Sequence, residues 1–293
     1  MRPAAGPGPV GRGGGSGSAT GSGIWLGEGG LGRLEGKRAL VVGAAGEGNM
    51  AQAIARRFVA EGATVTVAGR RMEPLARFAS DIGGHAVELD MTSQASIDSG
   101  VEAARAAMGG LSVAVNATGW GLLKPFLETT GEELDAMVAL QFKGPFHFCQ
   151  ACVRAMRAGG SIIQISSATA TIMLEDHAAY MGTKAGADHV IRCVANEFGA
   201  QGIRANSISP GLTETPMTAQ ARQVPGLFES FRAGYPMGRW GTSDDIAAAA
   251  VFLASDECFM TGENLQVNGG LTLRRNPTKA EMAAAVRAAR DRS

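Results

Sequence analysis

The chain has 293 residues, 45% of them apolar, and its 27 basic and 27 acidic side chains cancel at neutral pH. This length suits one large α/β domain or two small ones, and the balanced charge argues against a nucleic-acid-binding surface. No apolar run is long enough to span a membrane. The composition therefore predicts a soluble, enzyme-like protein with neither nucleic acid nor membrane as a partner.

Residues 1–33 are rich in Gly, Pro and Ser and show no periodic apolar pattern. Such a segment buries too little apolar surface to offset its ordering entropy, so we expect a disordered leader. It lacks the apolar stretch of a secretory signal. Cys149 and Cys152 form a C-x-x-C within an amphipathic helical pattern, which favours two core residues in a reduced, cytoplasmic protein.

Short β-branched runs alternate with longer helical stretches from residue 34 to residue 275. The expected strands are residues 38–43, 63–69, 85–90, 112–117, 161–167, 203–209 and 264–270, and the main helices 50–62, 74–83, 94–109, 131–156, 179–202 and 244–255. This alternation predicts βαβ units with right-handed crossovers. We therefore expect an α/β fold: a single Rossmann-type, doubly wound, parallel seven-stranded sheet with helices on both faces.

The stretch GAAGEGNMA, residues 43–51, joins the first strand to the first helix. Gly46-x-Gly48-x-x-Ala51 fits the form G-x-G-x-x-G/A, in which glycines let a pyrophosphate approach the N–H groups at a helix N-terminus. Asn49 can cap that helix and contact phosphate. The stretch is therefore predicted to bind a dinucleotide.

The second strand ends in Gly69, Arg70 and Arg71. A site for NAD(H) usually has an acidic residue here that binds the ribose 2′-hydroxyl. Guanidinium groups suit a 2′-phosphate instead, so NADP(H) is favoured over NAD(H). The alternative is a solvated basic pair at a strand end.

Several further segments, in chain order, resemble the short-chain dehydrogenase/reductase family over about residues 34–273. They are Asp90 after the third strand, NATG at 116–119, Ser167 at the end of SIIQISS, Tyr180-x-x-x-Lys184, the stretch IRANSISPGLTETPM and TGENLQVNGGL. With the glycine-rich loop, the resemblance implies a cofactor site of Gly43, Gly46, Gly48, Asn49, Met50, Arg70, Arg71, Asp90, Met91, Asn116, Ala117, Gly119, Tyr180, Lys184, Pro210, Gly211, Leu212 and Thr213.

The resemblance implies hydride transfer between NADP(H) and a carbonyl or secondary alcohol. A carbonyl that accepts hydride needs a proton donor, and a free tyrosine with a pKa near 10 is a poor one at neutral pH. Lys184 lies one helical turn from Tyr180 and would lower its pKa. Ser167 can donate a hydrogen bond to the substrate oxygen. We expect Tyr180 as the acid-base catalyst, helped by Ser167 and Lys184.

Two departures from the family pattern bear on this prediction. Gln141 occupies the position of an Asn that holds a proton-relaying water in the family, so we expect Gln141 to keep a relay role. The glycine-rich loop resembles that of the divergent enoyl-acyl-carrier-protein reductases, with Asn49 at a serine position. Those enzymes separate tyrosine and lysine by six residues, whereas Tyr180 and Lys184 are separated by three. An enoyl (C=C) thioester reductase and a non-catalytic dinucleotide sensor are the alternatives.

The C-terminal third has two segments outside the repeating pattern. Residues 213–242 form a long segment with three prolines, expected to be a lid whose Leu227, Phe228 and Phe231 make an apolar pocket. Residues 276–293 read as a short basic helical tail with no obvious partner. Glu175, Asp176 and His177 are expected to form a solvated loop. The four histidines lie on different elements, so no metal site is predicted. The resemblance implies a homo-oligomer, tetramer or dimer.

Overall fold

The computed structural model describes residues 32–292, so all but the last two residues of the expected leader lie outside the described residues. The strands are β1 (Arg38–Val42), β2 (Thr64–Gly69), β3 (His85–Glu88), β4 (Val113–Asn116), β5 (Gly160–Ile165), β6 (Ile203–Pro210) and β7 (Asn264–Val267). All pair in parallel in the order β3-β2-β1-β4-β5-β6-β7. The predicted doubly wound seven-stranded sheet is confirmed.

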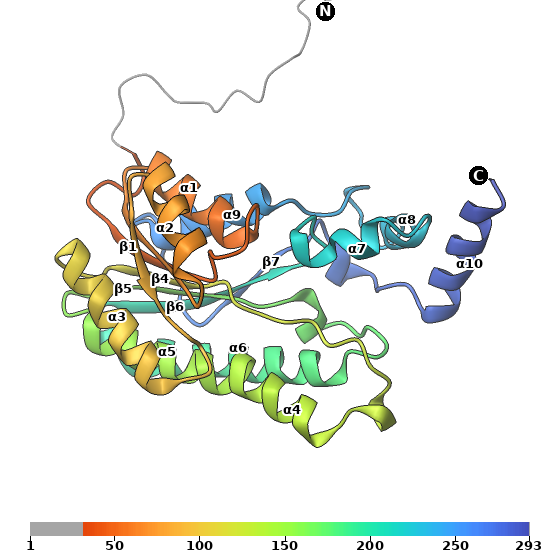
Figure 1. Cartoon of the computed structure of the whole chain (residues 1–293), viewed down its shortest axis with the longest axis horizontal. Helices are drawn as coiled ribbons and strands as arrows, with labels where there is room; N and C mark the ends of the chain where they lie inside the picture. The colour runs from red at the N-terminus through yellow and green to blue at the C-terminus, as the bar shows by residue number, and fades with distance from the viewer. Residues whose placement is uncertain (1–31, 293) are drawn as a thin grey trace, which may run out of the picture. The chain divides into compact units, whose positions relative to one another are not determined.

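Helices cover both faces of this sheet. They are α1 (Met50–Ala60), α2 (Met72–Asp81), α3 (Gln94–Met108), α4 (Gly131–Val138), α5 (Gly144–Ala155), α6 (Ala178–Phe198), α7 (Ala219–Arg222), α8 (Leu227–Arg232), α9 (Ser243–Ala254) and α10 (Lys279–Arg290). In Figure 1, α1, α2 and α9 lie over one face and α3 to α6 over the other. No helix in the described part of the chain is long and apolar enough to cross a membrane.

The sheet is buried on both sides because apolar residues follow one another along its strands. In β1, Val41 packs with Ile54 and Phe58 of α1, whereas the neighbouring Leu40 packs on the opposite face with Phe148 of α5. Successive side chains of a strand point to opposite faces, so each central strand contributes to two cores. This double core fixes the sheet and leaves the loops at the carboxyl ends of the strands for function.

Strands β1 and β4 lie side by side at the centre of the sheet, yet α1 and α4 leave them toward opposite faces. This reversal of the winding direction opens a crevice at the carboxyl ends of the strands, which is where ligands bind in such sheets. A cleft of about 1220 Å³ lies there. It is lined by the loops that follow β1, β2, β4, β5 and β6, together with residues of α6, α8 and α10.

The sequence predicted one long helix over residues 131–156, but the structure divides it. A capping box of Thr130 and Glu133 begins α4, and a π-helical turn, Ala139–Lys143, separates α4 from α5. Pro145 has no N–H to donate to the carbonyl of Gln141 and would clash with it in a regular helix. Gly144 donates instead to the carbonyl of Ala139, five residues back. The wider turn resolves the conflict, as π turns often do near functional sites.

Candidate active site

The glycine-rich loop is closed by the side chain of Asn49. Its carbonyl oxygen accepts a hydrogen bond from Gln52 N–H at 3.0 Å and caps α1, and its amide donates to the carbonyl of Gly43 at 2.7 Å. The expected capping role is therefore present. The N–H groups of Met50 and Ala51 begin the helix and have no partner within it. Both residues lie on the cleft, where their N–H groups are available to an anion.

Gly43 has no room for a side chain. Its φ is +105°, and a Cβ there would lie 3.1 Å from the backbone of Ala117 at the end of β4. The loop after β1 and the loop after β4 thus touch through their backbones. Gly43 and Ala117 both line the cleft, so this part of its surface is formed by backbone atoms of the two loops.

The two arginines after β2 have different surroundings. Arg71 donates a hydrogen bond to the carbonyl of Ala45 at 2.8 Å, so it braces the glycine-rich loop. Arg70 is exposed on the cleft, and its charge acts on Asp90. Burial alone would raise the pKa of Asp90, but hydrogen bonds from Thr92 and the charge of Arg70 lower it. Asp90 is therefore an ionised group that faces the same end of the cleft as Arg70.

Two residues predicted to contact the cofactor, Asn116 and Gly48, do not line the cleft. The amide of Asn116 is buried, donates to Gln164 at 3.0 Å and accepts two hydrogen bonds from Thr118. The N–H of Gly48 donates to the side chain of Gln52 at 3.0 Å. These residues shape the loops, while the other predicted cofactor residues all line the cleft.

Ser167, Tyr180 and Lys184 meet at the centre of the cleft. Ser167 follows β5, and Tyr180 and Lys184 lie one turn apart at the start of α6. The Ser167 hydroxyl lies 2.8 Å from the hydroxyl of Thr169, and it acts on the Tyr180 phenol by lowering its pKa. The buried ammonium of Lys184 donates to the carbonyl of Ile165 at 2.8 Å and lies 5.7 Å from the centroid of the Tyr180 ring. The three residues predicted from the sequence thus line the same cleft.

The acidities in this group differ from the expectation. Burial raises the pKa of Tyr180, the hydrogen bond with Ser167 lowers it in part, and the charge of Asp188 raises it. The expected lowering of this pKa by Lys184 is not found in this structure. Burial lowers the pKa of Lys184 itself to about 8, although Asp188 acts in the opposite direction. Because this pKa lies only slightly above neutral pH, Lys184 is mostly protonated at pH 7 and loses its proton as the pH rises through about 8.

Asp188, which the sequence analysis did not single out, lies one turn beyond Lys184 on α6. Its carboxylate accepts hydrogen bonds, each of 2.7 Å, from Ser166 next to the end of β5, Ser207 of β6 and Asn264 of β7. These three hydrogen bonds connect α6 to β6, to β7 and to the residue that follows β5. Asp188 follows Lys184 by four residues, a spacing that places both on one side of α6 and could have indicated its importance. Its hydrogen-bond partners are too distant in the chain to be predicted from a motif.

Gln141 is buried behind the cleft in the π-helical turn. Its side-chain oxygen accepts a hydrogen bond from Trp120 N–H at 3.2 Å, and its amide donates to Thr183 at 3.4 Å and contacts Met137. A Cβ on Gly119 would lie 3.1 Å from this oxygen and 3.5 Å from the nitrogen of Lys184. Gly119, in the loop after β4, therefore lies close to both the Gln141 side chain and the Lys184 ammonium.

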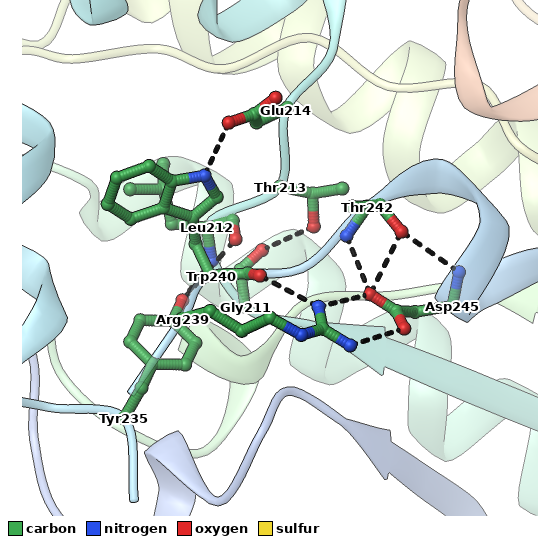
Figure 2. Close-up of polar contacts among 9 residues, drawn as sticks. All are labelled: Gly211, Leu212, Thr213, Glu214, Tyr235, Arg239, Trp240, Thr242 and Asp245. Atoms are coloured by element: carbon green, nitrogen blue, oxygen red, sulfur yellow. Dashed lines mark hydrogen bonds and ion pairs between the residues drawn. The ribbon is translucent and has the colours of Figure 1, made fainter. Parts of the chain in front are cut away.

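The segment that follows β6, residues 211–214, is hydrogen-bonded to residues at the end of the lid, as Figure 2 shows. The N–H of Leu212 donates to the hydroxyl of Tyr235 at 2.6 Å, and the indole N–H of Trp240 donates to Glu214 at 2.6 Å. Arg239 forms a bidentate ion pair with Asp245 at the start of α9. Sequence patterns identified the segment itself but not these supports.

The substrate end of the cleft lies beyond Ser167 and Tyr180. The expected lid is partly helical, with α7 and α8, and its Phe228 and Phe231 are buried against the cleft. The expectation of a solvated loop at residues 175–177 is wrong. Asp176 pairs with Lys279 of α10 at 2.5 Å, and the ring of His177 packs edge-on against that of Tyr180. The tail, expected to have no partner, lies against this end of the cleft.

Several features of the cleft suit a nicotinamide dinucleotide. Free N–H groups at the start of α1 suit a pyrophosphate, and the absence of a side chain at Gly43 lets it approach. Arg70 and Asp90 lie at the end where the adenosine part would bind, and Lys184 with Pro210–Thr213 lie at the other. The residues present fit the cofactor. Among the described residues, no group of three or more His, Cys, Asp or Glu side chains could hold a metal ion.

Comparison with known proteins gives consistent matches. A family model described as enoyl-(acyl carrier protein) reductase matches residues 43–272. D-Threitol dehydrogenase of Mycolicibacterium smegmatis is 34% identical over 250 residues, which are 83% of this chain and 95% of the relative. The 2,5-dichloro-2,5-cyclohexadiene-1,4-diol dehydrogenase of Sphingobium indicum is 36% identical over 248 residues, which are 81% of this chain and 97% of the relative.

A solved structure of a gluconate 5-dehydrogenase from Burkholderia cenocepacia, in complex with NADP and tartrate, is 28% identical with a TM-score of 0.78. The match covers 82% of this chain and 97% of that one. The dehydrogenases among these matches are similar to this chain over almost their whole length, and the residues that the family model matches include the cleft lining from Gly43 to Leu271. The chain belongs to the short-chain dehydrogenase/reductase family and is an oxidoreductase that moves a hydride between a nicotinamide dinucleotide and a carbonyl/alcohol pair.

Proposed function

We propose that Tyr180, Ser167 and Lys184 carry the reaction, with NADP(H) as the preferred cofactor. The observation that supports this most is the convergence of two hydroxyl groups and one buried ammonium on a single cleft that fits a dinucleotide. The bound nicotinamide would supply or accept the hydride. The phenol of Tyr180 would give its proton to the carbonyl oxygen during reduction and take it back during oxidation.

The other groups act on that proton. The Ser167 hydroxyl would donate a hydrogen bond to the same substrate oxygen and stabilise the negative charge that develops on it. Lys184 is not among the groups that shift the pKa of Tyr180, but its ammonium lies 5.7 Å from the centroid of the Tyr180 ring, where we propose that its charge offsets the negative charge of the phenolate formed during the reaction. Gln141, beside Lys184, would keep a relay role through that lysine.

Tyr180→Phe tests the assignment of the acid-base residue. The variant keeps the ring but lacks the proton donor, so we expect turnover of any accepted ketone to fall about 10² to 10⁴-fold. Binding of NADPH, measured by fluorescence titration, should stay within twofold of the wild type. Near-normal turnover in the variant would refute the assignment.

The preference for NADP(H) is supported by Arg70, which lies exposed on the cleft at the end of β2 where an acidic residue would favour NAD(H). The gluconate 5-dehydrogenase with bound NADP is consistent with it. We expect Arg70→Asp to raise the Michaelis constant for NADPH about tenfold or more, as the loss of a charged hydrogen bond does. The constant for NADH should change much less.

Arg77→Asp is the matched control, because Arg77 carries the same charge on α2 but pairs with Glu73 away from the cleft. Equal effects of Arg70→Asp on the two cofactors would disprove the preference. The same would follow if Arg77→Asp reproduced the effect on NADPH.

Reduction of a C=C bond in an enoyl thioester is the second candidate function, because the matching family model is described by that activity. The spacing of Tyr180 and Lys184 and the presence of Ser167 favour the carbonyl reaction instead. NADPH oxidation with cyclohexanone, 2-cyclohexenone and crotonyl thioester separates the two. Cofactor binding without turnover of any of them would point to a dinucleotide sensor.

We also propose that the chain forms a homodimer or homotetramer through the outer surface of α4, the π-helical turn and α5. Three large apolar side chains are exposed there: Leu134, Phe142 and Phe146. Exposed apolar patches of this kind mark protein interfaces. The mass of the purified chain in solution, measured by light scattering, tests the proposal.

A further inference from the structure

Helix α10 lies beyond residues 43–272, the part that the family model matches, yet it reaches the substrate end of the cleft. A capping box of Thr278 and Glu281 begins it, and Figure 1 shows it beside α8. Asn276, Lys279 and Met282 line the cleft. The role of this helix is not explained by the cofactor site or by the catalytic residues.

Polar contacts attach α10 to the loop that precedes Tyr180. Lys279 forms an ion pair with Asp176 at 2.5 Å, and its N–H donates to the carboxylate of Glu175 at 2.5 Å. The buried amide of Asn276 donates to the carbonyl of Met173 at 3.0 Å. Asp176 has a φ of +62°, the one positive φ of a non-glycine residue among residues 32–292. Its carbonyl also accepts a hydrogen bond from Lys124 N–H at 2.8 Å, so this residue joins three segments.

Close backbone packing attaches α10 to the lid. A Cβ on Gly226, just before α8, would lie 2.3 Å from the carbonyl oxygen of Ala285 and 3.0 Å from the Cβ of Ala289. Met282, Ala285 and Ala289 recur at helical spacing, so they share the face that α8 covers. The helix is therefore docked on two sides, against α8 and against residues 173–176.

Besides Lys279, α10 adds the apolar side chain of Met282 to the cleft. Met282 packs in one cluster with Leu174, Leu227 and Phe231, near the Ala168 that follows Ser167. Most charged groups near this end are paired, Lys279 with Asp176 and Arg275 with Glu281, while the carboxylate of Glu175 accepts a hydrogen bond from the N–H of Lys279. The apolar part of this wall, Met282 with Leu174, Leu227 and Phe231, offers no hydrogen bonds to replace those that a hydroxyl-rich substrate makes with water.

We propose that α10 forms the outer wall of the substrate site and selects ketones and secondary alcohols with a bulky hydrocarbon ring beside the reacting carbon, in preference to open-chain polyols. This rests on the proposed reaction at Tyr180. The ring would lie against Met282, Phe231 and Leu174 while its carbonyl oxygen contacts Tyr180 and Ser167. A polyol would lose its hydration at the same wall without compensation, which costs affinity.

The test uses the full chain with NADPH and three ketones: 2-decalone, the polyhydroxy ketone erythrulose, and 2-butanone, which is too small to reach Met282. We expect kcat/KM for 2-decalone to exceed that for erythrulose at least tenfold. Met282→Glu should lower kcat/KM for 2-decalone at least tenfold and change that for 2-butanone less than twofold. Met282→Ala, a milder change, should lower the 2-decalone value about threefold.

Ala284→Glu is the matched control. Ala284 is exposed on the same helix, so this substitution introduces the same charge away from the wall. The proposal is overturned if erythrulose is the better substrate, or if Ala284→Glu and Met282→Glu have equal effects. If the wild type reduces none of the ketones, the proposed reaction fails instead. Calorimetric binding of 2-decalol to the NADP⁺-saturated protein then decides the matter, since binding weakened by Met282→Glu but not by Ala284→Glu supports the wall, and unchanged binding refutes it.

Discussion

The cofactor half and the substrate half of the cleft differ in how far apart in the chain their parts lie. The cofactor half consists mainly of loops that directly follow strands, and much of its surface is backbone, as at Gly43 and at the start of α1. The substrate half combines residues 168–177, α8 and α10, which meet through an apolar cluster, an ion pair and close packing at Gly226. A recurrent ligand can be held by short local patterns, whereas selection among substrates needs surfaces that a chain can vary independently.

The catalytic group lies on the border between these halves and should show the largest effect. Lys184→Met removes the ammonium beside Tyr180, so we expect turnover to fall about 10³-fold. The same change should raise the free energy of unfolding at pH 7 by about 1 to 2 kcal/mol, because a buried cation is costly even after the lost bond to Ile165 is subtracted. Activity and stability would thus change in opposite directions.

The pH dependence of stability checks this interpretation. Burial lowers the pKa of Lys184 from 10.5 to about 8, so the unfolded chain binds more protons between these values. The free energy of unfolding of the wild type should therefore rise, relative to the Lys184→Met variant, as the pH increases from about 8 to 10.5. Parallel curves from chemical denaturation of the two proteins would contradict a lowered pKa.

Gly43→Ala tests whether the cofactor half depends on bare backbone. The substitution places a Cβ against Ala117 at a φ of +105°, and the strain of about 1 to 3 kcal/mol should weaken NADPH binding roughly 10 to 100-fold. Gly48→Ala is the matched control, since Gly48 also has a positive φ but no atom within 4 Å of the added Cβ. Fluorescence titration of NADPH measures both. Similar losses would show that the contact between the two loops is unimportant.

The same contrast explains what the sequence could predict. Patterns within a few residues, or the order of motifs along the chain, predict one group of features. These are the sheet, the glycine-rich loop, the capping role of Asn49 and the set of Ser167, Tyr180 and Lys184. The pairing of Asp176 with Lys279 could not be predicted, because a salt bridge between residues so distant in sequence leaves no periodic signal. Its loop therefore looked like an ordinary solvated one.

The π-helical turn is a difference of another kind. Apolar spacing over residues 131–156 continues through it, so the pattern indicated an unbroken helix. The local chemistry of Pro145 decides otherwise, since it removes one hydrogen bond of the helix and widens the turn that carries Gln141. Burial of Gln141 beside Lys184 depends on that turn.

Gln141 should show the smallest effect, and its variants separate a relay from a purely structural role. Gln141→Ala leaves the N–H of Trp120 without its acceptor and should lower kcat about three to tenfold, the equivalent of one ordinary hydrogen bond. If Gln141 relays protons toward Lys184, the pH profile of kcat should shift as well, and Gln141→Asn, which keeps the amide, should restore it. If Gln141 only holds the loop after β4, KM for NADPH should rise in Gln141→Ala while the pH profile stays unchanged. Unchanged kcat, KM and pH profile would show that Gln141 has neither role. Among the residues considered between the two halves, only Ser167, Tyr180 and Lys184 would then remain candidates for a part in the reaction.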